Sequence, residues 1–211
     1  MTNFGNMTLR DFSKSLASTN PTPGGGSAAA IALSQSAALT VMVAEITIGR
    51  DKWKDGWSAS EIAKNVATPL IHDGLVLADK DTDAFMGVMD SFKLPKGNDD
   101  EIANRKLAIS NATHQASIVP LETAQVALEL LLTHKELAEF GNANAVTDVA
   151  VASLLASAAC KGALFNVEIN ATSLPDELST DLLSNVKNIR DQSREASRDV
   201  MKAVYDRMGT N

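Results

Sequence analysis

Hydrophobic positions recur every three or four residues along most of the chain, which is the spacing of one face of an α-helix. No segment shows the convincing alternation of a half-buried β-strand. Within residues 99–139 the spacing is carried by Ile109, Ala112, Ala116, Val119, Thr123, Val126 and Leu130. The pattern therefore predicts a protein built from helices.

Residues that start and stop helices divide this pattern into five or six helices. Thr8 and Asp11 have the spacing of a capping box, and prolines and glycines mark the breaks. Pro69 either kinks the third helix or marks its start, and Pro120 predicts a bend in the fourth. The expected helices cover residues 8–17, 24–48, 58–92, 99–139 and 143–166, and a last segment after NATSLPDELS.

The last helix has a heptad pattern with a weak seam. Its members are Leu182, Val186, Ile189, Ser193, Ala196, Val200 and Ala203. Because a serine and two alanines lie in the seam, we expect this helix to pack on its neighbours rather than form a long coiled coil. Short connections between helices favour antiparallel neighbours. The predicted fold is all-α, an antiparallel up-and-down bundle of five to six helices in one domain over residues 1–211.

Composition narrows the class of protein. The 211 residues are 45% hydrophobic and only 4% aromatic, which favours one core of helices packed through small side chains. A net charge of −7 without a basic run longer than a pair argues against a nucleic-acid partner. Cys160 is the only cysteine, so no internal disulfide can form. Since residues 1–10 also lack the apolar core of a signal peptide, we expect a cytoplasmic protein.

One segment has the length of a membrane span. Residues 28–48 are rich in alanine rather than leucine, and they include Ser34, Gln35 and Glu45. Charged and amide groups are costly in the bilayer core, so we expect a buried helix and no membrane partner.

The stretch NPTPGGGSAAA, residues 20–30, places three glycines directly before a helix. It lacks the lysine of a P-loop, and no strand precedes it as a dinucleotide fingerprint requires. Glycines at a helix start can present free backbone donors to an anion or a carbonyl. They can equally permit a close contact between helices or a plain turn, and the sequence leaves both interpretations open.

Two aspartates fall within predicted apolar helices, where a carboxylate needs a stabilising partner. Asp81 falls on or beside the apolar stripe of residues 58–92, where it needs either an ion-pair partner or a ligand. Asp148 enters an apolar helix near its start, where the helix dipole favours it even without a ligand.

Four asparagines are further polar candidates. Asn166 and Asn170 are four residues apart, on one face if the helix extends that far, and they suit either a heterocycle edge or a helix end. Asn142 and Asn144 can be turn residues and nothing more. The histidines lie far from one another in the sequence, so we expect no metal site.

Five collinear motifs resemble the cyclodeaminase/cyclohydrolase family. They are LASTNPTPGGGSAAAIA, DTDAFMGVM followed by LPK, ASIVPLETA, GNANAVTDVAVA and FNVEIN, and they span residues 9–170. This family comprises the C-terminal domain of formiminotransferase-cyclodeaminase and the standalone bacterial methenyltetrahydrofolate cyclohydrolases.

The resemblance implies an all-helical homodimer whose small-molecule partner is a tetrahydrofolate derivative, with no other cofactor. The implied activity is hydrolysis of methenyltetrahydrofolate to formyltetrahydrofolate, or ring closure of formiminotetrahydrofolate with loss of ammonia. We favour the hydrolysis because this chain has no formiminotransferase domain. A non-catalytic helical module that binds folate is the alternative from another class.

The resemblance also implies which residues form the site. Asp81 and Asp148 match family carboxylates and are the candidate catalytic residues, as a base for water, as a negative group near the cationic carbon, or as a grip on the pterin. Asp51 interrupts a basic stretch that relatives tend to have, which weakens the positive charge expected to attract the glutamate tail. The candidate substrate-binding residues are Pro23, Gly24, Gly25, Gly26, Ser27, Lys52, Asn142, Asn144, Asn166 and Asn170.

Overall fold

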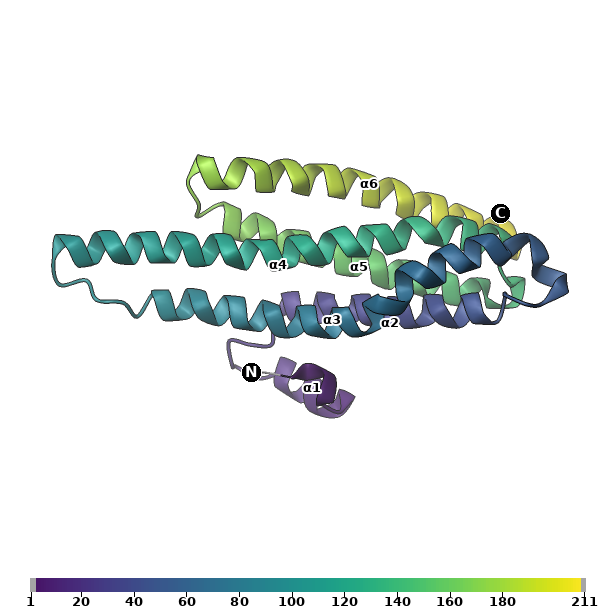
Figure 1. Ribbon diagram of the computed structural model, residues 1–211, viewed down its shortest axis with the longest axis horizontal. Helices are drawn as coiled ribbons and strands as arrows, with labels where there is room; N and C mark the ends of the chain where they lie inside the picture. The colour runs from purple at the N-terminus through teal and green to yellow at the C-terminus, as the bar shows by residue number, and fades with distance from the viewer. Residues whose placement is uncertain (1–2, 210–211) are drawn as a thin grey trace.

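Six α-helices make up most of the computed structural model, which describes residues 3–209. No strand occurs in that part of the chain, so the all-α prediction is confirmed. The helices are α1 Leu9–Leu16, α2 Gly25–Glu45, α3 Trp57–Ser91, α4 Asp99–Phe140, α5 Val146–Ala171 and α6 Asp176–Met208, with short 3-10 helices η1 Phe4–Asn6, η2 Asp51–Gly56 and η3 Ala143–Ala145 (Figure 1).

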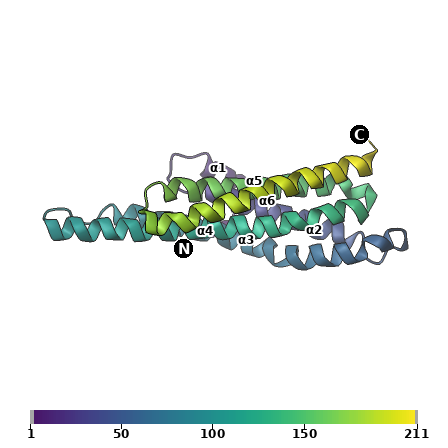
Figure 2. The same cartoon turned by 90° about the horizontal axis from the view of Figure 1, so that it is seen from above.

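The five long helices run up and down as predicted. Each packs against the next one in the chain, and α2 also packs against α5, which closes a four-helix bundle. Helix α6 covers α4 and α5, and the short α1 lies outside the bundle (Figures 1 and 2).

Because successive helices alternate in direction, their ends and the segments that connect them lie at two opposite ends of the bundle. At the first end lie the start of α2, the last half of α3, the first half of α4 and the turn from α5 to α6. At the second end lie η2, η3, the end of α4 and the start of α5. Helix α4 is about 63 Å long and α2 about 32 Å, so the α3–α4 hairpin projects beyond the other helices at the first end (Figure 1).

Local signals explain where the helices begin. The Thr8 side chain accepts a hydrogen bond of 3.1 Å from the backbone of Asp11, which confirms the predicted cap of α1. Asn98 accepts one of 2.9 Å from the backbone of Glu101 at the start of α4. Helix α3 begins at Trp57 and continues through Pro69, so the alternative that this proline marks the helix start is wrong.

Small side chains let the helices approach closely. Ala30, Ala37 and Ala159 are completely buried in the core. A Cβ atom on Gly74 of α3 would lie 2.8 Å from the carbonyl oxygen of Ala30 on α2, so only glycine fits there. All seven heptad positions of α6 are buried against neighbouring helices, as predicted.

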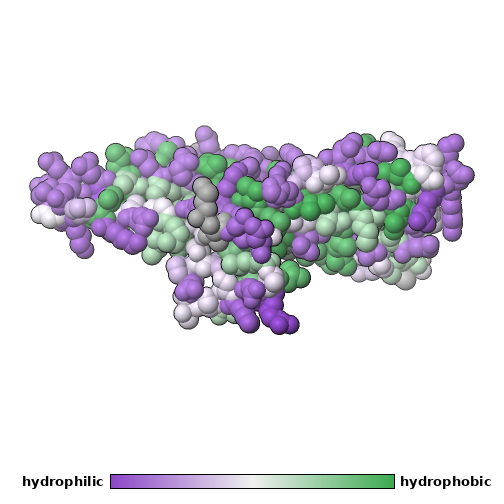
Figure 3. All heavy atoms as spheres, turned by 60° about the horizontal axis from the view of Figure 1, so that its bottom comes forward, coloured by the Kyte–Doolittle hydropathy of each residue, from purple (hydrophilic) through white to green (hydrophobic). Residues whose placement is uncertain are grey.

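Three segments are long and apolar enough to span a membrane by length and composition: α2, α4 and residues Ala143–Ala171. Between 50 and 56% of each apolar window is buried inside the bundle. Hydrophilic side chains cover the tip of the α3–α4 hairpin, whereas apolar side chains reach the surface along the middle of the same face (Figure 3).

Candidate active site

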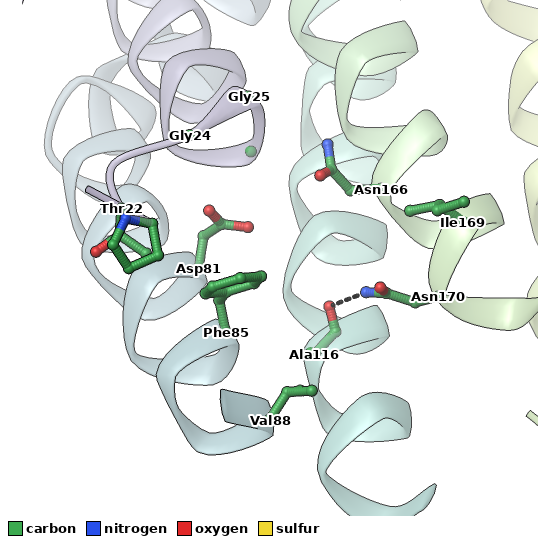
Figure 4. A pocket seen from close by; sticks show the side chains of 12 residues that line it. Thr22, Gly24, Gly25, Asp81, Phe85, Val88, Ala116, Asn166, Ile169 and Asn170 are labelled. Atoms are coloured by element: carbon green, nitrogen blue, oxygen red, sulfur yellow. Dashed lines mark hydrogen bonds between the residues drawn. The ribbon is translucent and has the colours of Figure 1, made fainter. Parts of the chain in front are cut away.

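A cavity of about 340 Å³ lies between the start of α2, the last third of α3, Ala116 of α4 and the last turns of α5 (Figure 4). Its size is within the range of small-molecule sites. We call it the Asp81 pocket; it is lined by Pro21, Thr22, Gly24, Gly25, Gly26, Asp81, Phe85, Val88, Ala116, Asn166, Ile169 and Asn170. It brings together six of the residues that the sequence predicted for the site.

Asp81 lies on α3, and its carboxylate contacts the first turn of α2. The Ser27 hydroxyl donates a hydrogen bond of 3.0 Å to its Oδ2, and the Ser27 backbone donates another. A Cβ atom on Gly26 would lie 2.6 Å from the Asp81 Cγ, so any larger residue here would displace the carboxylate. The positive end of the α2 dipole favours a carboxylate at this position. Asp81 therefore has hydrogen-bonding partners at α2, and the buried ion pair considered from the sequence is absent among the described residues.

The pKa of Asp81 is raised above its usual value. Burial is the main cause, because it disfavours the charged form, and the hydrogen bonds from Ser27 offset this only in part. A carboxylate with a raised pKa is a stronger base than an ordinary one and accepts a proton closer to neutral pH. In Figure 4 its oxygens extend toward the cavity.

Gly24 and Gly25 differ from Gly26 in what surrounds them. No protein atom lies within 4 Å of a Cβ atom built on either, and both residues line the cavity. The Gly24 backbone is extended, with φ −130°, so its conformation does not require glycine. Contact between helices thus explains Gly26 alone. At Gly24 and Gly25 the bare backbone borders open space, which fits close approach by a ligand.

Asn166 and Asn170 line the opposite wall from adjacent turns of α5. The Asn166 Nδ2 donates to the Gly162 carbonyl at 2.9 Å, and the Asn170 Nδ2 donates to the Ala116 carbonyl of α4 at 3.1 Å. Neither carbonyl oxygen of the two side chains accepts a hydrogen bond from the residues described here. The pair can therefore offer amide oxygens to a ligand.

Phe85 forms an apolar wall that the sequence analysis did not assign to the site. Its ring lies beneath the Asp81 carboxylate in Figure 4, and the residue is 40% exposed. Val88 and Ile169 complete this wall. Residues four apart share one face of a helix. The spacing from Asp81 to Phe85 could therefore have identified the ring as part of the site.

Two predicted residues of the glycine turn support the cavity without lining it. Pro23 is buried between the lining residues Thr22 and Gly24. Ser27 is completely buried and donates its hydroxyl hydrogen bond to Asp81.

Asp148 lies at the other end of the molecule. It is half-buried in the first turn of α5, 18 residues before Asn166. This separation is about 27 Å along the helix, or about five turns, so the two residues share one face of α5. Lys52 follows the end of α2, which lies about 30 Å from the glycine turn, and its ammonium group lies 4.7 Å from the centre of the Trp53 ring. A single chain therefore does not bring either residue to the Asp81 pocket.

Asn142 and Asn144 also lie at this second end. The Asn142 backbone donates to the Thr47 hydroxyl at 3.0 Å, and its Nδ2 donates to the Ile46 carbonyl at 3.1 Å. Its Oδ1 accepts a bond of 3.0 Å from the backbone of Asn144. The structure thus gives Asn142 the role of a buried turn residue, which was the alternative left open, while Asn144 is exposed.

The described residues include no group of three or more His, Cys, Asp or Glu that could hold a metal ion. The arrangement in the Asp81 pocket is a carboxylate of raised pKa facing bare backbone, two amides and an aromatic wall. Such a site can hold a flat polar ring and exchange a proton with it or with water.

Residues 8–197 match the sequence profile of the formiminotransferase-cyclodeaminase family. The chain is 39% identical to methenyltetrahydrofolate cyclohydrolase from Methylorubrum extorquens, over 82% of this chain and 83% of that protein. It is 32% identical to the formimidoyltransferase-cyclodeaminase of Mus musculus, over 81% of this chain and 31% of that longer protein. The crystal structure of formiminotetrahydrofolate cyclodeaminase from Thermotoga maritima superimposes with a TM-score of 0.85 at 27% identity, covering 96% of this chain and 98% of that one.

Proposed function

Because the chain belongs to the formiminotransferase-cyclodeaminase family, we propose that it is a folate-interconverting enzyme that hydrolyses methenyltetrahydrofolate to formyltetrahydrofolate. The relative named as a methenyltetrahydrofolate cyclohydrolase supports this activity, since the two chains match over most of both lengths. The chain spans about a third of the formimidoyltransferase-cyclodeaminases that it matches, so the transferase activity in their name is not part of the proposal.

One observation carries the proposal: the bare backbone of Gly24 and Gly25 faces the same cavity as a carboxylate of raised pKa. A pterin is a flat ring with an edge of donors and acceptors. Phe85 offers it a face to stack on, and the amides of Asn166 and Asn170 offer hydrogen bonds at the edge.

The chemistry needs one base. The methenyl carbon is already electrophilic because it shares a positive charge with two nitrogens. A water oxygen bonds to this carbon while Asp81 takes one of its protons. The resulting hydroxyl group then loses its proton as the carbonyl forms, one carbon–nitrogen bond breaks, and that nitrogen gains a proton. The products are formyltetrahydrofolate and one released proton. The negative charge of Asp81 also stabilises the cationic substrate before water attacks.

Ring closure of formiminotetrahydrofolate with loss of ammonia is the second candidate. Its support is the structural neighbour from Thermotoga maritima, which matches over nearly the whole of both chains. The same carboxylate would then serve the departing amine, since ammonia must leave with an added proton.

The two substrates, supplied separately to the purified protein, distinguish these activities. Methenyltetrahydrofolate absorbance should fall faster than the spontaneous rate if the chain is a cyclohydrolase, and should rise from formiminotetrahydrofolate if it is a cyclodeaminase. Asp81→Asn should abolish either rate. If wild type and this variant both match the uncatalysed rate with both substrates, the protein is a folate-binding module and not an enzyme.

We also propose that the enzyme is a homodimer paired through α5. Val151, Leu154, Phe165 and Ile169 form an apolar stripe on this helix and are 47 to 67% exposed. Ile169 belongs to this stripe and also lines the Asp81 pocket. A second copy on the stripe would therefore cover the apolar surface and close the open side of the pocket.

An antiparallel pairing of two α5 helices would complete the catalytic residues. Asp148 and Asn166 lie on one face of α5, about five turns apart. A two-fold axis near the middle of that face would bring Asp148 of a second copy to Asn166 of the first. The two carboxylates predicted from the sequence would then share one site, each supplied by a different copy.

Mixing two inactive variants tests the shared site. Asp81→Asn and Asp148→Asn should each lose turnover when pure. After subunit exchange, half of the dimers are mixed and each of these has one intact site, so about a quarter of wild-type activity should return. Absence of recovery despite verified exchange would contradict a shared site, and full activity of pure Asp148→Asn would remove Asp148 from the catalytic residues.

This hydrolysis needs no cofactor beyond the folate substrate. We further propose that the enzyme acts in the cytoplasm, a location consistent with Cys160 being the only cysteine of the 211 residues, so that no internal disulfide can form.

A further inference from the structure

We propose that a second cavity next to the Asp81 pocket binds the glutamate tail of the folate through Arg105, an inference that rests on the proposed function. The family resemblance implied this role for the basic stretch that contains Lys52, but in a single chain Lys52 lies at the opposite end of the bundle. The second cavity lies at the first end, between the end of α3, the start of α4 and the turn from α5 to α6.

This cavity has a volume of about 560 Å³, and we call it the Arg105 pocket. It is lined by Val88, Phe92, Arg105, Lys106, Ile109, Ser110, Thr113, Asn170, Thr172, Ser173, Leu174 and Pro175. Val88 and Asn170 also line the Asp81 pocket, so the two cavities adjoin across these side chains. A ligand bound at Asp81 therefore has a neighbouring space into which a long substituent can extend.

The charge of the Arg105 pocket is opposite to that of the protein. The whole chain has a net charge of −7, yet the only charged residues lining this cavity are two cations, Arg105 and Lys106. Asp176 and Glu177 follow Pro175 at the start of α6, but neither lines the cavity. Two cations without a lining carboxylate attract an anionic group.

Arg105 is held in place by the protein. Its Nε and Nη2 donate to the carbonyl oxygen of Phe92 at 3.3 and 3.0 Å, and its guanidinium lies 5.5 Å from the centre of the Phe92 ring. Its remaining nitrogen, Nη1, has no hydrogen-bond partner among the described residues. A guanidinium already fixed in one orientation loses little conformational entropy when it binds a carboxylate.

The distance between the two sites fits a folate. Phe92, the C-cap residue of α3, follows Asp81 by 11 residues, which is about 16 Å along the helix axis. The ligand that spans this distance needs a hydrogen-bonding ring at the carboxylate end, an apolar middle, and negative charge at the guanidinium end. Between the two ends lie the apolar side chains of Val88 and Ile109. A pterin, a benzoyl ring and a glutamate follow one another in that order.

The test compares probes with and without the tail. Methenyltetrahydrofolate carries the glutamate and methenyltetrahydropteroate lacks it. Arg105→Gln removes the charge but keeps a side-chain donor for the Phe92 carbonyl. It should raise KM for methenyltetrahydrofolate about three- to tenfold and leave KM for methenyltetrahydropteroate unchanged. Arg105→Lys should recover part of the loss, and Lys106→Gln should show a smaller selective effect than Arg105→Gln.

Arg198→Gln is the matched control, because Arg198 is exposed on α6 and lines neither cavity. It should leave both KM values unchanged. Equal KM changes for the two probes in Arg105→Gln, or no change with either, would overturn the tail site while leaving the proposed function intact. If Lys52→Gln instead shows the selective loss, the tail lies at Lys52 and the Arg105 proposal is wrong.

A binding measurement keeps this proposal separate from the proposed function. Dissociation constants for 5-formyltetrahydrofolate and 5-formyltetrahydropteroate are measured by titration calorimetry with wild type and Arg105→Gln. A selective loss of affinity for the glutamate form supports the tail site even if no substrate is turned over. Equal affinities of wild type for the two ligands would overturn it.

Discussion

Substituting alanine at two adjacent glycines should separate ligand binding from folding. A Cβ atom at position 25 meets no protein atom within 4 Å, whereas one at position 26 would lie 2.6 Å from the Asp81 Cγ. Gly25→Ala should therefore leave the free energy of unfolding unchanged or raise it by up to about 1 kcal/mol, since alanine is less flexible in the unfolded chain. Gly26→Ala should lower it by about 1–3 kcal/mol through overpacking.

These free energies convert to measurable melting temperatures. For a chain of this size about 1 kcal/mol corresponds to about 2–4 °C, so Gly26→Ala should melt about 2–12 °C below wild type. Gly25→Ala should melt at the wild-type temperature or up to about 4 °C above it. Thermal unfolding followed by far-UV circular dichroism measures both shifts.

Gly25→Ala should lower enzymatic activity even though it keeps or raises the stability of the fold. One methyl group placed where the ligand approaches the backbone should lower kcat/KM for methenyltetrahydrofolate by about 10- to 200-fold. The assay is the decrease in methenyl absorbance under steady-state conditions. A Gly25→Ala protein with wild-type kcat/KM would refute the reasoning, because the ligand would then not approach this backbone.

Three further predictions concern charge and assembly. Asp81→Asn should have a higher free energy of unfolding than wild type at pH 7. A carboxyl group whose pKa is raised in the folded state stabilises the fold most below pH 3.8, and this contribution is lost as the pH rises through the folded pKa. The difference in denaturant midpoint between the variant and wild type should therefore shrink as the pH is lowered. His134 is completely buried, and burial lowers its pKa to about 3. Because this histidine is protonated in the unfolded chain below about pH 6.5, the free energy of unfolding should fall by at most about 1.4 kcal/mol for each pH unit below that value. His134→Gln should reduce this pH dependence, measured by urea titrations. Leu154→Glu on the α5 stripe should give monomers in sedimentation experiments with helix content retained, whereas Leu183→Glu on α6, also exposed, should stay dimeric.

The helices were largely predictable because their signals are local. Capping residues and apolar spacing set the bounds of α3 and α4 to within a residue of those observed. The helix of residues 24–48 is shorter at its end, where the chain turns after Glu45. That residues 1–211 form one domain stays a prediction.

The grouping of the site residues was predictable only in part. Gly26 and Asp81, which the family resemblance assigned to one site, lie in contact, but Asp148 lies about 27 Å along α5 from Asn166. The predicted up-and-down order already implied this, because the start and the end of one helix cannot lie at the same end of a bundle. Residue types indicated which side chains carry chemistry. How these side chains are distributed between the two copies of the proposed dimer depends on how the copies pair, which no local sequence pattern encodes.

The buried alanines of α2 and α5 set a limit on how this protein can vary. Ala30, Ala37, Ala156 and Ala159 are completely buried where helices meet, and added methylene groups in such contacts cost about 1–3 kcal/mol. In a saturation mutagenesis screen these positions should therefore tolerate glycine or serine better than valine or leucine. Side-chain volume, more than hydrophobicity, would define the accessible sequence space of the bundle.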